Sequence, residues 1–215
     1  MTQICIFPIP ECVTFPGTVF PLHVFEPRYR QMIESCLETG MPVAICHTEK
    51  EISPGKDGLP LEEALQVNQA TYKPYSVFSA GVCVLRDRMD DGRLLVDVHI
   101  GQRYRLGKLV QHLPYQVFEC EPFDDQPLTI QQSKAADLLV EKVRHRLLAM
   151  VQGDSKTSKK LTELLNSEAW LEKPASEFSF ELFGLIRFNA DLLQQILEMD
   201  SPVERLDTVL HLMNE

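Results

Sequence analysis

The feature of this sequence that most constrains its fold is a change in the spacing of its apolar residues between Pro122 and Pro127. Before this point apolar side chains mostly recur at every second position, as in strands with one buried face. After it they recur about every 3.6 residues, which is the period of a helix. The sequence therefore predicts the α+β class, with a β-rich unit at residues 1–123, a linker at 124–130 and a helical bundle at 131–215.

The clearest local signal in the β-rich part is a hairpin at Asp91-Gly92. Asp-Gly readily adopts the positive φ angles of a tight primed turn, which matches the twist of paired strands. Apolar and polar residues then alternate from Arg93 to Ile100, so one face of that strand is expected to be buried. Further strands are expected at residues 4–6, 43–46, 81–86, 102–110 and 115–120.

One helix is expected to interrupt the strands early in the chain. Pro27 suits a first helical position, and Glu26 before it favours the positive end of the helix dipole. Apolar residues then recur at helical spacing until Gly40 ends the run. The residues expected to face the core are Tyr29, Met32, Ile33 and Cys36.

A polar stretch rich in proline and glycine runs from Lys50 to Ser76. We interpret this composition as a long surface loop with one helical turn around Leu61 to Leu65. Loops of this length are uncommon unless they are functional or mobile. Its apolar residues are candidates for contacts with a partner, and a disordered linker is the alternative. These residues are Leu59, Leu61, Tyr72 and Tyr75.

The carboxy-terminal part is expected to form several helices. A long one at 131–151 carries one apolar stripe, expected to consist of Ala135, Leu139, Val143, Leu147 and Met150. Shorter helices are expected near 158–168, 176–187 and 190–199. The last helix begins at Ser201-Pro202-Val203-Glu204, which combines a serine cap with proline in the first turn and glutamate at the third position.

The charge of the chain limits its partners. It carries 21 Lys and Arg against 31 Asp and Glu, a formal net charge of −10, and no basic run. Nucleic-acid binding depends on Lys and Arg that neutralise phosphates, so that partner is not expected. No apolar run approaches the roughly 18 residues that span a bilayer, and the amino terminus does not resemble a signal peptide.

The six cysteines are irregularly spaced and contain no CxxC pair, and the six histidines show no metal-ligand spacing. We therefore expect free thiols in a reducing compartment, a cytoplasmic protein, and no metal or other cofactor.

Several short runs, in a fixed order, carry a resemblance to a known family. Those before residue 30 resemble the opening of the amino-terminal domain of Lon proteases. The later ones resemble its return to the sheet, a strand motif containing Gly101 and Arg103, and its closing helices. The runs are Phe7–Pro10, Val13–Gly17, Pro21–Tyr29, Phe78–Val82, Val98–Arg105 and Leu192–Glu198.

This resemblance implies a PUA-like pseudo-barrel followed by a helical bundle. In the protease this domain recognises protein substrates, whereas other domains carry the ATPase and peptidase chemistry. The nearest approach to a phosphate-binding loop, Ser53–Asp57, lacks the spacing and the hydroxyl residue that such a loop needs. We therefore expect a stand-alone, non-enzymatic binding module, with no catalytic residues.

The expected partners are unfolded or apolar polypeptide segments, with a role as an adaptor in protein quality control and with a protease or chaperone as a further partner. One alternative is a PUA-like module that binds a small ligand. A second alternative is a peptidase-associated hydrolase with an unrecognised site.

Aromatic residues and arginine dominate binding energy at protein interfaces. The partner-binding candidates are therefore Phe15, Phe25, Arg28, Tyr29 and Tyr104. The alternative for Phe15 and Phe25 is a place in the core.

Other motif residues are expected to be structural. Pro16 and Pro21 fix φ in turns, and Gly17 and Gly101 are expected to adopt backbone conformations that other residues resist. A buried ion pair between Glu26 and Arg103 is hypothesised to join the early helix to a late strand.

Overall fold

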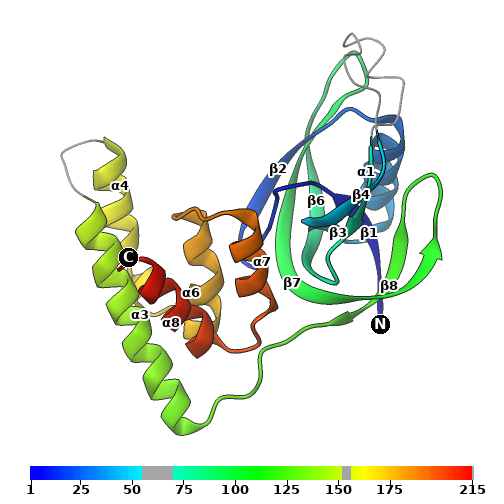
Figure 1. Ribbon diagram of the computed structural model, residues 1–215. Coiled ribbons are helices and arrows are strands. Elements are labelled where there is room, and N and C mark those ends of the chain that lie inside the picture. Colours follow the sequence, from blue (N-terminus) through cyan, green and yellow to red (C-terminus); the bar gives the residue numbers. More distant parts are fainter. Residues whose placement is uncertain (55–69, 152–155, 215) are drawn as a thin grey trace. The chain divides into compact units, whose positions relative to one another are not determined.

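The computed structural model describes residues 1–54, 70–151 and 156–214 (Figure 1). It confirms the α+β class, with one large sheet and carboxy-terminal helices. The chain divides into two compact units. The first contains residues 1–124 and 188–197, and the second contains residues 125–187 and 198–214. Among the described helices, none has the length and apolarity that crossing a membrane requires.

The first unit is built on a six-stranded sheet with the order β2-β7-β6-β3-β1-β8. Only β1 and β3 are parallel; the other pairs are antiparallel. Because β7 also pairs with β8, five of these strands close into a ring and β2 extends it. The strands are β1 (Thr2–Pro8), β2 (Val19–Val24), β3 (Val43–Cys46), β6 (Val77–Arg88), β7 (Leu94–Gln111) and β8 (Val117–Pro122).

Strand β7 closes the ring because it is long enough to serve two neighbours. Its 18 residues pair first with β2 and β6 and then, from Tyr104 onward, with β8. The sequence predicted two strands with a break at Gly101, and this prediction is wrong. Gly101 lies inside the continuous strand, and a Cβ added there would meet nothing within 4 Å. Paired strands on both sides hold the backbone extended there without a glycine-specific conformation.

The turns before β2 depend on residues that the sequence singled out. Gly17 has a φ of 80°, in the left-handed region that favours glycine, and its N–H donates to the Ile100 carbonyl over 2.9 Å. Pro16 precedes it. Pro21 lies exposed in β2, the strand at the end of the sheet order, where a residue without an N–H is tolerated.

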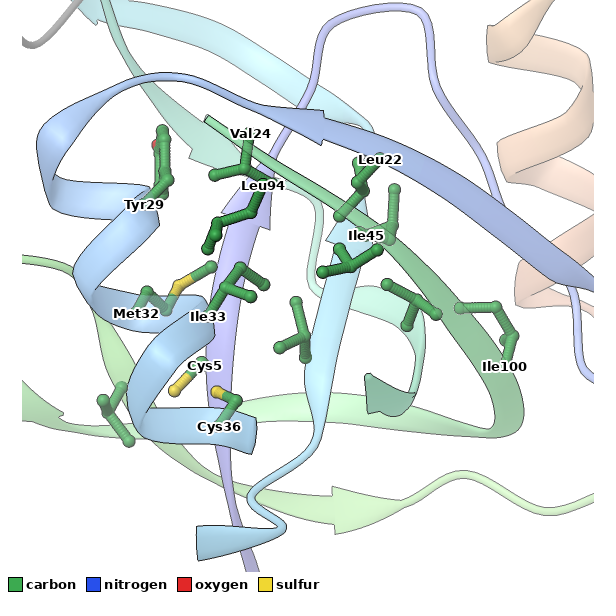
Figure 2. Close-up of a cluster of buried hydrophobic side chains, with 14 residues drawn as sticks. Cys5, Leu22, Val24, Tyr29, Met32, Ile33, Cys36, Ile45, Leu94 and Ile100 are labelled. Atoms are coloured by element: carbon green, nitrogen blue, oxygen red, sulfur yellow. The ribbon is translucent and has the colours of Figure 1, made fainter. Parts of the chain in front are cut away.

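Helix α1 (Pro27–Thr39) packs on one face of the sheet. Its buried residues are those predicted, and Gly40 ends it with a φ of 74°. Figure 2 shows Tyr29, Met32 and Ile33 facing side chains of the sheet such as Val24 and Leu94. A second apolar cluster includes Ile4, Ile6, Phe78 and Tyr104. Strand β1 contributes alternate residues to the two clusters, so both of its faces are buried.

A separate two-stranded antiparallel sheet, β4 (Thr48–Ser53) and β5 (Thr71–Pro74), occupies the ends of the stretch that was expected to be loop. The expected helical turn at 61–65, with Leu59 and Leu61, lies outside the described residues. Tyr72 and Tyr75 are half-buried and are not the exposed anchors that were expected. The Tyr75 ring stacks on His47, with ring centroids 5.2 Å apart.

The second unit is helical. A capping box between Thr129 and Gln132 begins α3, and the Ser201 hydroxyl accepts from the Glu204 N–H at the start of α8. The helices of this part of the chain are α3 (Ile130–Met150), α4 (Lys156–Leu165), α5 (Glu168–Leu171), α6 (Ala175–Glu181), the 3-10 turn η1 (Leu182–Gly184), α7 (Ala190–Glu198) and α8 (Pro202–Leu212).

Helix α7 departs from the expected division into residues 1–123 and 131–215, because residues 188–197 group with the first unit. Buried polar contacts explain this placement. The Gln194 side chain donates to the Val77 carbonyl over 2.9 Å, and Arg103 Nη1 donates to the Leu197 carbonyl over 2.7 Å. These contacts satisfy main-chain acceptors of β6 and α7 that would otherwise be buried without a donor.

The helical unit has a buried arginine at its centre. The Arg205 side chain is fully buried and forms a two-point contact with Asp125, at 2.6 and 2.5 Å. It also donates to the Ser179 hydroxyl and the Met199 carbonyl, and its guanidinium lies 3.9 Å from the centre of the Phe180 ring. This network joins the segment before α3 to α6 and α8, and it accounts for the burial of a charge.

Candidate functional site

The first unit contains a cavity of about 320 Å³ where β1 ends and α1 begins. Its walls come from three stretches that are distant in the sequence: residues 7–10, residues 22–29 and residues 70–72. The lining is mainly apolar, and His23 and Glu26 are its polar members. The aromatic and aliphatic side chains that line it are Phe7, Ile9, Leu22, Phe25, Tyr29 and Tyr72.

A second cavity of about 100 Å³ adjoins the first. The two have Pro8, Tyr29 and Tyr72 as common walls. The far side of the smaller cavity is formed by residues 112–116, the turn between β7 and β8. We call the two cavities together the groove.

Local sequence explains the shape of the groove. Pro8 ends β1, and the proline-rich run that follows cannot continue a ladder because proline lacks an N–H. The Phe7 ring stacks on Tyr29, in the first turn of α1, with centroids 4.2 Å apart. Burial raises the pKa of Tyr29 to about 12, so this phenol stays neutral near pH 7 and supplies an aromatic surface rather than a charge.

Arg28 connects the start of α1 to β5. Its guanidinium donates to the Ala70 carbonyl over 2.7 Å and to the Thr71 hydroxyl over 3.0 Å, and it pairs with Glu26 at 3.0 Å. It also lies 4.6 Å from the centre of the Tyr29 ring. Arg28 therefore holds the β5 wall of the groove against the helix.

Replacing Arg28 with alanine is expected to free β5 while leaving the ring of strands folded. Three charge-assisted contacts are lost from a largely buried side chain, so local opening becomes easier by about 1–3 kcal/mol. Amide exchange at Thr71 to Lys73 should accelerate by about tenfold or more. Arg88→Ala, which removes an exposed pair with Glu34, is the control and should leave these amides unchanged. Equal exchange in both variants would contradict the assignment.

His47 holds the loop that follows Pro10, a wall residue of the groove, and was not chosen as a site residue from the sequence. It is buried, its Nδ1 accepts from the Glu11 N–H over 3.1 Å, and its Nε2 lies 3.4 Å from Asp191 Oδ1. Glu11 has a φ of 59°, uncommon for a residue other than glycine. These contacts fix the loop that follows Pro10, and no local sequence pattern signals them.

The structure does not place Cys46 beside His47 as an activated nucleophile. Cys46 and His47 are adjacent in sequence, but Cys46 belongs to the inner apolar cluster and its burial raises the pKa of its thiol well above the usual range. All six cysteines are free thiols. Within residues 1–54, 70–151 and 156–214, no group of three or more His, Cys, Asp or Glu side chains could hold a metal ion.

Two of the five partner-binding candidates lie in the core. Phe15 is 3% exposed and Tyr104 is 9% exposed, so neither offers a surface to a partner. Phe25, at 37% exposed, Arg28 and Tyr29 all line the groove. Tyr72, which the sequence offered as a contact residue of the polar stretch, also lines the groove, whereas Phe7 was missed because its approach to α1 depends on where β1 lies.

Glu26 and Arg103, hypothesised as an ion pair, each contact other residues as well. Glu26 pairs with Arg28 beside the groove. Arg103 is 2% exposed and binds the Leu197 carbonyl, with its guanidinium 4.5 Å from the centre of the Phe123 ring. Arg103 is therefore buried, and its pairing with Glu26 stays a prediction.

Comparisons with known proteins fit this architecture. The chain is similar over all its length to the N terminal domain of Mycobacterium avium complex Lon protease, with a TM-score of 0.69, 13% identity and 99% of that chain covered. It is also similar to a Lon N-terminal domain protein from Xanthomonas campestris, with a TM-score of 0.55, 21% identity and 98% of each chain covered. Identities this low support a common fold. A family model described as the ATP-dependent protease La (LON) substrate-binding domain matches residues 3–215, and the chain therefore belongs to this family.

Proposed function

We propose that this protein binds exposed apolar or unfolded segments of other polypeptides in the groove and catalyses no reaction on them. The observation that carries the proposal is the mainly apolar groove with Phe25, Tyr29 and Tyr72 on its walls, in a chain of the LON substrate-binding family. Aromatic side chains provide large contact areas at little cost in conformational entropy. A cytoplasmic adaptor that delivers damaged chains to a protease or chaperone would use such a groove.

The charge of the protein supports a partner that is neutral or basic. A formal net charge of −10 disfavours acidic segments, nucleic acids and anionic membrane surfaces. Unfolded segments rich in apolar residues and lysine meet this condition.

A small-molecule ligand is the alternative that the cavity volume allows, because about 320 Å³ lies in the range of ligand pockets. Such pockets usually contain several convergent polar groups. Here Glu26 is already paired with Arg28, which favours an apolar polypeptide over a polar small ligand. A hydrolase is the other alternative, and degradation of casein by the purified protein, with or without ATP, would establish it in place of simple binding.

Replacing Phe25 with alanine is expected to weaken binding of a permanently unfolded polypeptide, such as reduced and carboxymethylated α-lactalbumin, about tenfold. The half-exposed ring is removed from the groove with little effect on the fold. Fluorescence anisotropy with a labelled polypeptide measures the change. Leu171→Ala is the matched control, since Leu171 is 48% exposed and lies outside the groove, in α5. An unfolded polypeptide that does not bind the unchanged protein at micromolar concentrations would refute the proposed function.

A further inference from the structure

Strand β5 has one paired edge and one open edge. It pairs with β4 in a sheet of two strands, and it forms no other ladder in the described part of the chain. Its residues Thr71 and Tyr72 line the groove. Which main-chain groups face the groove therefore decides what β5 can bind.

Three contacts determine the direction of these groups. The Tyr75 N–H donates to the His47 carbonyl, next to β4, so odd-numbered residues direct their main-chain groups toward β4. The Ala70 carbonyl accepts from Arg28 on the opposite side. Pro74 lies opposite Thr48 and has no N–H, which is consistent with an even-numbered residue that donates no bond to β4. Because directions alternate along a strand, the N–H and C=O of Tyr72 point away from β4.

The Tyr72 main-chain groups are available on that side. Within the described residues, no hydrogen bond to the N–H or the C=O of Tyr72 occurs on the side away from β4. An unpaired N–H and C=O on a strand edge form a template for another strand. Arg28 already occupies the neighbouring Ala70 carbonyl, which confines the template to the part of β5 beside the cavities.

The two cavities match the side-chain spacing of an added strand. Both have Tyr72 as a wall, so they flank the residue that presents the free donor and acceptor. Successive side chains of a strand point to opposite faces. A strand paired with Tyr72 would present alternate side chains to different surroundings, with about 320 Å³ available to a large apolar one and about 100 Å³ to a small one.

We propose that the ligand of the groove is an extended polypeptide segment that adds to β5 as a third strand through the main-chain N–H and C=O of Tyr72. The inference rests on the proposed function and specifies its mode. Main-chain pairing is largely independent of sequence, which suits recognition of many unfolded chains, and the cavities add a preference for apolar side chains. The net charge of −10 favours a neutral or basic segment.

The open edge of β2 is a poorer template than that of β5. Strand β2 ends the order of the large sheet, and Pro21 in its middle removes one of the donors that an added strand would need. Extended ligands are therefore assigned to β5 and not to β2.

A scan of backbone N-methyl groups tests the mode separately from the function. A short peptide is first cut from the unfolded polypeptide and shown to bind, and a methyl group is then placed on each amide in turn. Binding should weaken about tenfold or more at the one central position whose amide donates to the Tyr72 carbonyl, and change little at the positions on either side of it. Binding that is unaffected, or weakened equally at adjacent positions, overturns the added strand and leaves the proposed function standing. Failure of both peptide and unfolded polypeptide to bind removes both.

Amide exchange on the protein gives a second readout that needs no variant. Saturating peptide should slow exchange of the Tyr72 amide about tenfold or more, because that N–H gains a partner. The Lys73 amide, which faces β4, is the internal control and should change little. A bound peptide with no protection at Tyr72 contradicts the proposal.

Discussion

Replacing Arg205 with alanine is expected to lower the free energy of unfolding of the helical unit by about 3–5 kcal/mol. The substitution leaves the Asp125 carboxylate, which is 17% exposed, without its two-point partner. It also removes a donor from the buried Ser179 and the contact with the Phe180 ring. The loss exceeds that of a surface pair because Arg205 and Ser179 are fully buried, so the Ser179 hydroxyl cannot regain the lost donor from bulk water.

The single tryptophan makes this measurement specific to one unit. Trp170 is buried in α5 of the helical unit and contacts the Phe178 ring, so its fluorescence reports unfolding of that unit in urea. Arg146→Ala is the control, since Arg146 is exposed and binds the Met213 carbonyl, and it should cost less than about 1 kcal/mol. The double change Arg205→Met with Asp125→Leu should recover part of the loss. Equal effects of Arg205→Ala and Arg146→Ala would refute the importance of the network.

Replacing Gly81 with alanine is expected to destabilise the first unit by about 3 kcal/mol. A Cβ at this position would lie 1.8 Å from the His99 carbonyl oxygen of β7, and the atom it meets is main chain, which cannot rotate away. The register shift between Ala80 and Gly81 brings the two strands this close. Relieving this clash would require β6 and β7 to move apart at the centre of the sheet.

Gly101→Ala is the matched control for Gly81→Ala. Gly101 lies in the neighbouring strand, has open space around its Cα, and should tolerate alanine with a change of at most about 1 kcal/mol in either direction. Loss of tertiary structure, followed by near-ultraviolet circular dichroism and urea titration, measures both variants. Similar midpoints for the two would show that the sheet relaxes around residue 81.

Elements with a strong and unambiguous pattern could be predicted from the sequence. The buried face of α1, its proline start and its glycine end follow directly from the spacing of Tyr29 to Cys36. The stripe of α3 was harder. The structure buries Ala136 and Val140, whereas the sequence favoured Ala135 and Leu139. Apolar residues occupy all four positions, so only the neighbouring helices decide which pair faces inward.

The functional contacts depended on pairings between distant segments. Phe25, Arg28 and Tyr29 could be chosen because they surround a helix start, but Tyr72 reaches them from more than forty positions away. The burial of Arg205 and His47 could not be predicted for the same reason. Arg205 contacts Asp125, and His47 contacts Asp191 and the Glu11 N–H, and all of these partners are distant in the sequence. A charged side chain at the surface and one in the core look alike in a sequence until the partner is known.

Because residues 188–197 belong to the first unit, the β-rich unit is formed by two separate stretches of the sequence. A fragment that stops at residue 124 would lack the donor that Gln194 supplies to Val77 and the acceptor that Leu197 offers to Arg103. A fragment of residues 1–124, whether made by proteolysis or by domain grafting, would therefore have a partly uncovered sheet. A design that places the groove in another scaffold must therefore include α7 as well.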